Sequence, residues 1–193
     1  VGWGGLADVF DESKSNWANE YLELKSLLSE EEYKSAREST LTSFYTSPVV
    51  IESIYKALNN LGFRHGNILE PSCGIGNFFG MLPDEMKGSK MYGVELDSIS
   101  GRIAKQLYQN SNIAIEGYEE TKLPDSFFDV AVGNVPFGNF KVVDKKYDRL
   151  NFNIHDYFFA KSLDLTKPGG IIAFITSKGT MDKYDDSVRK YIA

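Results

Sequence analysis

The sequence predicts an α/β domain with a doubly wound, mostly parallel sheet, preceded by a helical extension. From about residue 67 onward, short apolar runs alternate with helical patterns, which is typical of β-α-β units. A glycine-containing turn follows the first of these runs, as at the ligand-binding edge of many parallel sheets. Residues 1–41 are polar and helical in pattern. We therefore expect an extension over 1–41 and the sheet domain over 42–193.

Two helix starts precede the first strand. Ser29 is followed by Glu32, the spacing of a capping box, in which the serine caps the helix and the glutamate bonds back to it. Ser47 and Pro48 then open a second helix, whose apolar residues recur at mainly helical spacing until Gly62. These signals predict one helix in the extension and another just before the sheet.

Five apolar runs are predicted to be the strands. Asp97 is placed to cap a helix after the second strand, and another helix is expected over 155–165. After it, the Pro168-Gly169-Gly170 segment is expected to turn the chain into the fifth strand. The last residues, 182–193, have the pattern of a helix. The predicted strands are 67–70, 91–96, 113–116, 128–133 and 171–176.

Composition narrows the class of protein. No apolar run approaches the roughly 20 residues of a membrane helix, and no secretion signal opens the chain. The single cysteine, Cys73, allows no internal disulfide and suits a reducing cytoplasm; we expect no bound metal and no membrane. The formal net charge is −6, whereas nucleic-acid-binding proteins usually carry a basic face. Any nucleic-acid surface should therefore be local, or lie in another part of the protein.

The turn after the first strand is the first candidate binding element. Its glycines permit a sharp turn and close approach of a ligand, although an isolated Gly-x-Gly is also found in plain tight turns. Glu70 can accept a charge-assisted hydrogen bond from an ammonium group. Glu95 ends the second strand, where an acid can accept hydrogen bonds from both ribose hydroxyls. Together they predict an adenosine that carries an amino acid, at a site formed by Glu70, Pro71, Gly74, Gly76, Glu95 and Leu96.

The second candidate element is Asn134-Val135-Pro136-Phe137, which follows the fourth strand. In a parallel sheet, this loop should face the same crevice as the glycine turn. The Asn134 side-chain carbonyl and the Val135 backbone carbonyl can each accept one N–H of a planar amine, freeing its lone pair to attack a sulfonium methyl. Pro136 stiffens the turn, and Phe137 can stack on a base flipped out of a helix. The same residues also suit an ordinary turn, so their position after the fourth strand is what makes them informative.

These two elements together resemble a known family. Residues 69–78 are similar to the S-adenosylmethionine (SAM)-binding motif I of N6-adenine-specific DNA methyltransferases, and 134–137 resemble their catalytic Asn-Pro-Pro-Phe/Tyr motif, with Val135 in place of the first proline. Tyr45-Thr46-Ser47-Pro48, ahead of a helix, resembles motif X, whose threonine region contacts the SAM carboxylate. The motif order is that of the gamma group, and the resemblance covers about residues 40 to 182.

The resemblance implies a Rossmann-like, SAM-dependent methyltransferase fold, with SAM as cofactor and adenine-containing DNA as substrate. The acid of motif III is either Glu116 or Glu119, with Tyr118 between them; we expect Glu119. Such a fold usually has seven strands and a target-recognition domain, so five strands predict a domain cut short after the fifth. Residues 2–6 also resemble large mobile-element proteins in which a methylase precedes a helicase-like region.

Other functions remain open at this point. The same loop chemistry serves methylation of RNA bases or of a glutamine amide in a protein. A non-catalytic module that binds SAM or docks within a larger protein is a further alternative. A nicotinamide dehydrogenase would explain the glycines and Glu95, but it would leave residues 134–137 without a role.

Overall fold

The computed structural model describes residues 3–40 and 44–193. The boundary expected between 41 and 42 lies outside the described residues. The helices are α1 (Ala18–Leu27), α2 (Glu30–Ser39), α3 (Pro48–Asn60), α4 (Asn77–Gly80), α5 (Ser98–Leu107), α6 (Ile154–Leu165), α7 (Gly179–Asp182) and α8 (Ser187–Ile192). The strands are β1 (Asn67–Glu70), β2 (Lys90–Glu95), β3 (Asn112–Ile115), β4 (Phe128–Asn134) and β5 (Thr166–Ile175).

The five strands form one parallel sheet in the order β3-β2-β1-β4-β5. The strand order reverses direction between β1 and β4, which are neighbours in the sheet but far apart in the chain. At such a switch point, the loops that leave adjacent strands diverge and open a crevice beyond the carboxyl ends. The predicted doubly wound, Rossmann-like α/β fold is confirmed.

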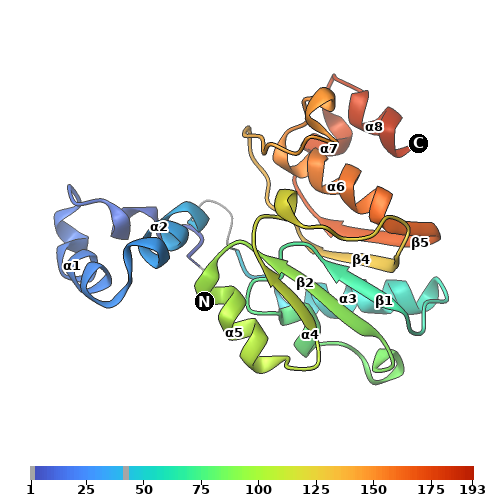
Figure 1. Cartoon of the computed structure of the whole chain (residues 1–193), viewed down its shortest axis with the longest axis horizontal. Coiled ribbons are helices and arrows are strands. Elements are labelled where there is room, and N and C mark those ends of the chain that lie inside the picture. The colour runs from blue at the N-terminus through green and yellow to red at the C-terminus, as the bar shows by residue number, and fades with distance from the viewer. Residues whose placement is uncertain (1–2, 41–43) are drawn as a thin grey trace.

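Helices cover both faces of the sheet (Figure 1). Side chains alternate along β1, so Ile68 enters one apolar core and Leu69 the other. The first core is built with α3, α4 and α5, and the second with α6 and α8. Burial on both faces explains why the strands were recognisable as continuous apolar runs.

Two of the three predicted capping residues, Ser29 and Asp97, form side-chain caps. The Ser29 hydroxyl accepts a hydrogen bond from the Glu32 backbone N–H, and the Glu32 carboxylate accepts one from the Ser29 N–H. Asp97 caps α5 through the backbone N–H groups of residues 99 and 100. Pro48 begins α3 as predicted, but Ser47 makes no capping side-chain hydrogen bond. Thus α2, α3 and α5 each begin at the position that the local sequence predicts.

Two predictions near the C-terminus were wrong. The segment 168–170 is not a turn ahead of the fifth strand; it lies inside β5, which begins at Thr166. The β4–β5 register shifts there, so the extra residues are absorbed as a bulge, with Gly169 at φ +82°. The helix expected over 182–193 starts later than predicted: α8 begins at Ser187, and residue 182 is the last residue of α7. The Asp185 carboxylate accepts a hydrogen bond from the Ser187 N–H at the start of α8.

The N-terminal extension has a small apolar core of its own around Val9, Phe10 and Ala36. It lies beside the sheet rather than on either face (Figure 1). Polar contacts join α2 to the start of α5: the Ser35 hydroxyl donates to Asp97 Oδ1 at 3.2 Å, and Arg102 pairs with Glu32. Among the described residues, no helix is long and apolar enough to cross a membrane.

Candidate functional site

A cavity of about 1200 Å³ opens beyond the carboxyl ends of the strands. The loops that follow β1, β2, β3 and β4 all contribute to its wall, and α6 closes one side. Ten of the thirteen predicted site residues line it: Tyr45, Thr46, Glu70, Pro71, Gly74, Glu95, Leu96, Glu119, Asn134 and Pro136.

The glycine turn and the Asn134 loop thus meet at one cavity, although a long stretch of chain separates them. Three predicted residues do not line it. Gly76 is the N-cap residue of α4, the Val135 side chain is buried in the core, and the Phe137 side chain is 41% exposed. The proposed role of Val135 uses its backbone carbonyl, so burial of its side chain leaves that proposal intact.

Glu95 is held in place by the backbone on both sides. Its Oε2 atom accepts a hydrogen bond from the Gly74 N–H at 2.7 Å, and its Oε1 atom accepts one from the Asp97 N–H at 2.7 Å. Burial raises the pKa of this carboxyl to about 7, although both hydrogen bonds oppose the shift. The acid that ends β2 is therefore oriented toward the glycine turn before any ligand arrives.

Glu70 is buried deeper, with 3% of its surface exposed. Among the described residues, its Oε2 atom has no hydrogen-bond partner. Burial, together with the nearby Glu95, raises the pKa of Glu70 well above its usual value. A buried carboxyl without a donor is costly unless a ligand supplies one, so this position fits a ligand ammonium group.

Asn134 presents a second acceptor without a donor. Its Nδ2 atom donates to the Phe44 carbonyl at 3.2 Å, and its own backbone carbonyl accepts from the Ser72 hydroxyl at 2.9 Å. These contacts fix the side chain, yet within the described part of the chain its buried Oδ1 atom has no partner. Such an acceptor fits an amino group delivered by a ligand.

The two glycines of the turn have different physical roles. Both have left-handed backbones, with φ +55° at Gly74 and φ +85° at Gly76. A Cβ atom at Gly74 would lie 3.6 Å from the Tyr45 ring, an ordinary contact. At Gly76 it would lie only 2.4 Å from the ring of Tyr108. Gly74 therefore shapes the cavity, whereas Gly76 is required for packing against Tyr108.

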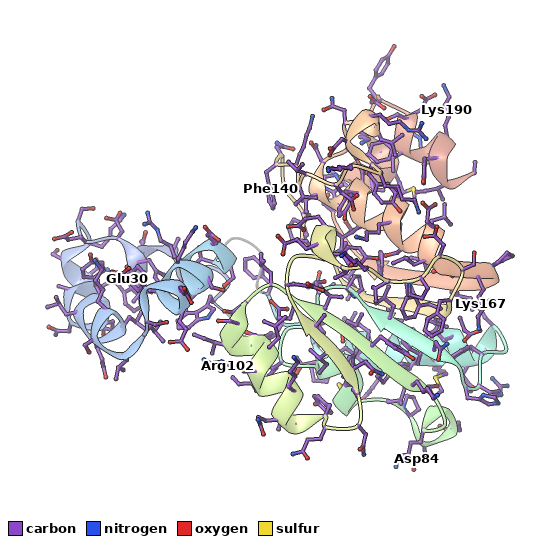
Figure 2. The ribbon with its side chains drawn as sticks, viewed as in Figure 1. Glu30, Asp84, Arg102, Phe140, Lys167 and Lys190 are labelled. Atoms are coloured by element: carbon purple, nitrogen blue, oxygen red, sulfur yellow. The ribbon has the colours of Figure 1, made fainter. Side chains whose placement is uncertain are left out.

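Sequence reasoning missed part of the wall. Phe44 and Phe140 line the cavity; Phe140 extends from the loop between β4 and α6 (Figure 2). The extension also contributes Tyr33 and Arg37. Nothing local in the sequence of the extension indicates this role, because it depends on how α2 docks against α5.

The structure also places Cys73 and the acidic residues that follow β3. Cys73 is buried, and burial raises the pKa of its thiol well above the usual value, which agrees with a packing role. Glu116 and Glu119 both line the cavity, as does Tyr118 between them. A side chain at Gly117 would collide with the Glu119 carboxylate, which folds back over that glycine.

Sequence similarity links the chain to a known protein family. Residues 18–193 match the family described as Eco57I restriction-modification methylase. The chain is 34% identical over 141 residues to the "Defense against restriction protein B" of Escherichia phage P1, covering 70% of this chain and 6% of that protein. It is 28% identical over 138 residues to the modification methylase CviBIII of Paramecium bursaria Chlorella virus NC1A, covering 68% of this chain and 36% of that protein.

Solved structures support the fold. A modification subunit assigned to a type I restriction enzyme from Vibrio vulnificus has a TM-score of 0.61 at 16% identity, covering 91% of this chain and 41% of that one. A TehB-like SAM-dependent methyltransferase from Corynebacterium glutamicum has a TM-score of 0.50 at 15% identity, covering 92% of this chain and 79% of that one. The family match spans the sheet, the cavity loops and α1–α2. The chain belongs to the Eco57I restriction-modification methylase family.

Proposed function

We propose that this chain binds SAM and transfers its methyl group to the exocyclic N6 amino group of adenine in DNA, with the target base flipped into the cavity. The observation that carries the proposal is a pair of acceptors, Glu70 Oε2 and Asn134 Oδ1, that lie in the wall of one cavity and have no hydrogen-bond partner among residues 3–40 and 44–193. One suits the ammonium group of an amino acid, and the other suits the N–H of a planar amine.

The residues present fit SAM. Glu70 would accept a hydrogen bond from its ammonium group, and Glu95 would accept hydrogen bonds from its ribose hydroxyls. The glycine turn would let it lie close to the protein backbone. Tyr45 and Thr46 would lie near its carboxylate, and Glu119 near its adenine. When bound, SAM would supply an electrophilic methyl group on a positively charged sulfur.

The chain's own residues would prepare the amine. Asn134 Oδ1 and the Val135 carbonyl would each accept one N–H, which localises the lone pair on nitrogen. Pro136, in the cavity wall, stiffens the backbone after these acceptors. Phe137, which follows it and is 41% exposed, would stack on the extruded base at the entrance to the cavity. This is catalysis by positioning and electrostatics, without a covalent enzyme intermediate.

The relatives named above support a DNA substrate through the restriction-modification family. The chain spans a minor part of the phage P1 and CviBIII proteins. For the whole protein we also propose a DNA substrate, a target-recognition or helicase-like region, a mobile-element origin and a cytoplasmic location. Methylation of RNA or of a protein glutamine would use the same acceptors.

The test is transfer of a labelled methyl group from SAM by the intact protein to DNA, RNA and protein substrates in parallel. We expect label in DNA, recovered as N6-methyladenine after nucleoside digestion. Label in RNA or protein alone would replace DNA as the substrate. SAM binding without transfer to any substrate would favour a non-catalytic docking module.

A further inference from the structure

Lys161, on α6, is the most buried lysine among the described residues, with 6% of its surface exposed. Its Nζ atom donates to the Tyr118 carbonyl at 2.6 Å and to the Thr121 carbonyl at 3.4 Å. It also pairs with Asp144 Oδ2 at 3.3 Å. One side chain thus contacts the turn after β3 and the loop after β4, two segments that the chain does not join directly.

The turn after β3 belongs to the proposed cofactor side. Tyr118 lines the cavity and is buried, with its hydroxyl 2.9 Å from the Ser162 hydroxyl. The Lys161 ammonium lies 4.9 Å from the Tyr118 ring centroid, within the range of a cation–π contact. Lys161 and Ser162 therefore hold both the backbone and the ring of this turn.

The loop after β4 belongs to the proposed substrate side, because it carries Phe140 and Val142 into the cavity wall. Asp144 organises this loop: its backbone carbonyl accepts hydrogen bonds from the N–H groups of Tyr147 and Asp148. The Asp144 carboxylate also accepts a hydrogen bond from the Tyr157 hydroxyl at 2.8 Å. Lys161 and Tyr157 together attach the loop to α6.

We infer that Lys161 is a positioning residue that sets the spacing between the cofactor side and the substrate side of the cavity. This inference rests on the proposed function, which assigns one side of the cavity to SAM and the other to DNA. Transfer of a methyl group needs both partners held at contact distance, and a displacement of about 1 Å can cost on the order of a hundredfold in rate. A buried charge paired with both loops is suited to prevent that displacement.

The test compares Lys161→Met, which keeps the length of the side chain, with Asp144→Asn, which removes the charge on the loop side only. Lys167→Met is the matched control, since Lys167 pairs with Asp129 at 2.7 Å and lies well away from Phe140 (Figure 2). Hydrogen–deuterium exchange should increase for Lys161→Met in both 117–121 and 140–150. For Asp144→Asn it should increase in 140–150 only, and for Lys167→Met in neither.

Kinetics then test the consequence. Lys161→Met should lower the single-turnover rate of methyl transfer on the order of tenfold or more and should raise both the Kd for SAM and the KM for DNA. Asp144→Asn should raise the KM for DNA and leave the Kd for SAM unchanged. The double variant should raise the KM for DNA no more than Lys161→Met does, because both changes break the same contact.

Unchanged exchange, or a lower Tm with unchanged SAM and DNA parameters, would overturn the inference. Absence of SAM binding by the unmodified protein would instead remove the proposed function, while the exchange experiment would still decide whether Lys161 couples the two loops.

If Lys161→Met does not fold, the comparison of Asp144→Asn with Lys167→Met still tests whether the Lys161–Asp144 pair holds the loop after β4. Faster exchange in 140–150 for Asp144→Asn alone would support it. Equal exchange in the two variants would contradict it.

Discussion

The carboxylate of Glu95 accepts a hydrogen bond from the backbone N–H of Gly74 at 2.7 Å. This contact joins the acid at the end of β2 to the turn after β1, so the two proposed cofactor elements form one unit. Asp97, the next hydrogen-bond partner of Glu95, is itself bonded to Ser35 of the extension. A change at Glu95 should therefore affect the shape of the turn as well as ligand binding.

Glu95→Ala should weaken SAM binding by about tenfold or more, because it removes the proposed ribose acceptor and the partner of the Gly74 N–H. Isothermal titration calorimetry measures the Kd. Glu85→Ala is the control, since Glu85 lies in the connection between α4 and β2 and does not line the cavity. Equal Kd values for Glu95→Ala and the unmodified chain would contradict the proposed cofactor site.

The stability of the ligand-free chain should depend on pH through Glu95. Its pKa is raised from 4.5 to about 7 in the folded chain, chiefly by burial. The folded state then holds a proton that the unfolded state has released, so the free energy of unfolding should fall as pH rises between about 4.5 and 7. The contribution is on the order of a few kcal/mol, and the raised pKa of Glu70 acts in the same direction.

Urea unfolding at pH 5 and pH 8 measures this dependence. Glu95→Gln should reduce the difference between the two pH values, since the amide does not titrate, while Glu85→Gln should leave it unchanged. A difference that is equally large in Glu95→Gln would show that Glu95 does not carry the effect.

Asn134→Ala should abolish methyl transfer and leave the Kd for SAM nearly unchanged. The substitution removes the Oδ1 acceptor, which has no partner in the described part of the chain and is proposed to act on the target amine and not on the cofactor. Single-turnover transfer and calorimetry measure the two properties separately. Loss of both to the same extent would mean that Asn134 supports the cofactor site instead.

Gly76→Ala should destabilise the chain by about 2 to 4 kcal/mol, because strain of a left-handed backbone adds to overlap with Tyr108. Gly62→Ala is the matched control: its φ is +94°, but a Cβ there would meet no atom within 4 Å, so it should show the backbone strain alone. Denaturant unfolding measures both. Equal losses in the two variants would show that the contact with Tyr108 costs nothing.

Much of the fold could be predicted from the sequence because its signals are local. The capping box at Ser29, the cap at Asp97 and the apolar runs of β1 to β4 depend on residues close together in the chain. The fifth strand was predicted to start too late, because a bulge is decided by the neighbouring strand. The register shift against β4 accommodates Gly169 and Gly170 inside the strand.

The sequence by itself determined that the glycine turn and the Asn134 loop would face one crevice, because parallel strands place their carboxyl ends at the same edge. Only the tertiary structure decided what surrounds them: Gly76 against Tyr108, α2 against α5, and Lys161 between two loops. The physical reason is that alternation and capping act over a few residues, whereas these contacts arise between distant segments that meet only when the layers pack.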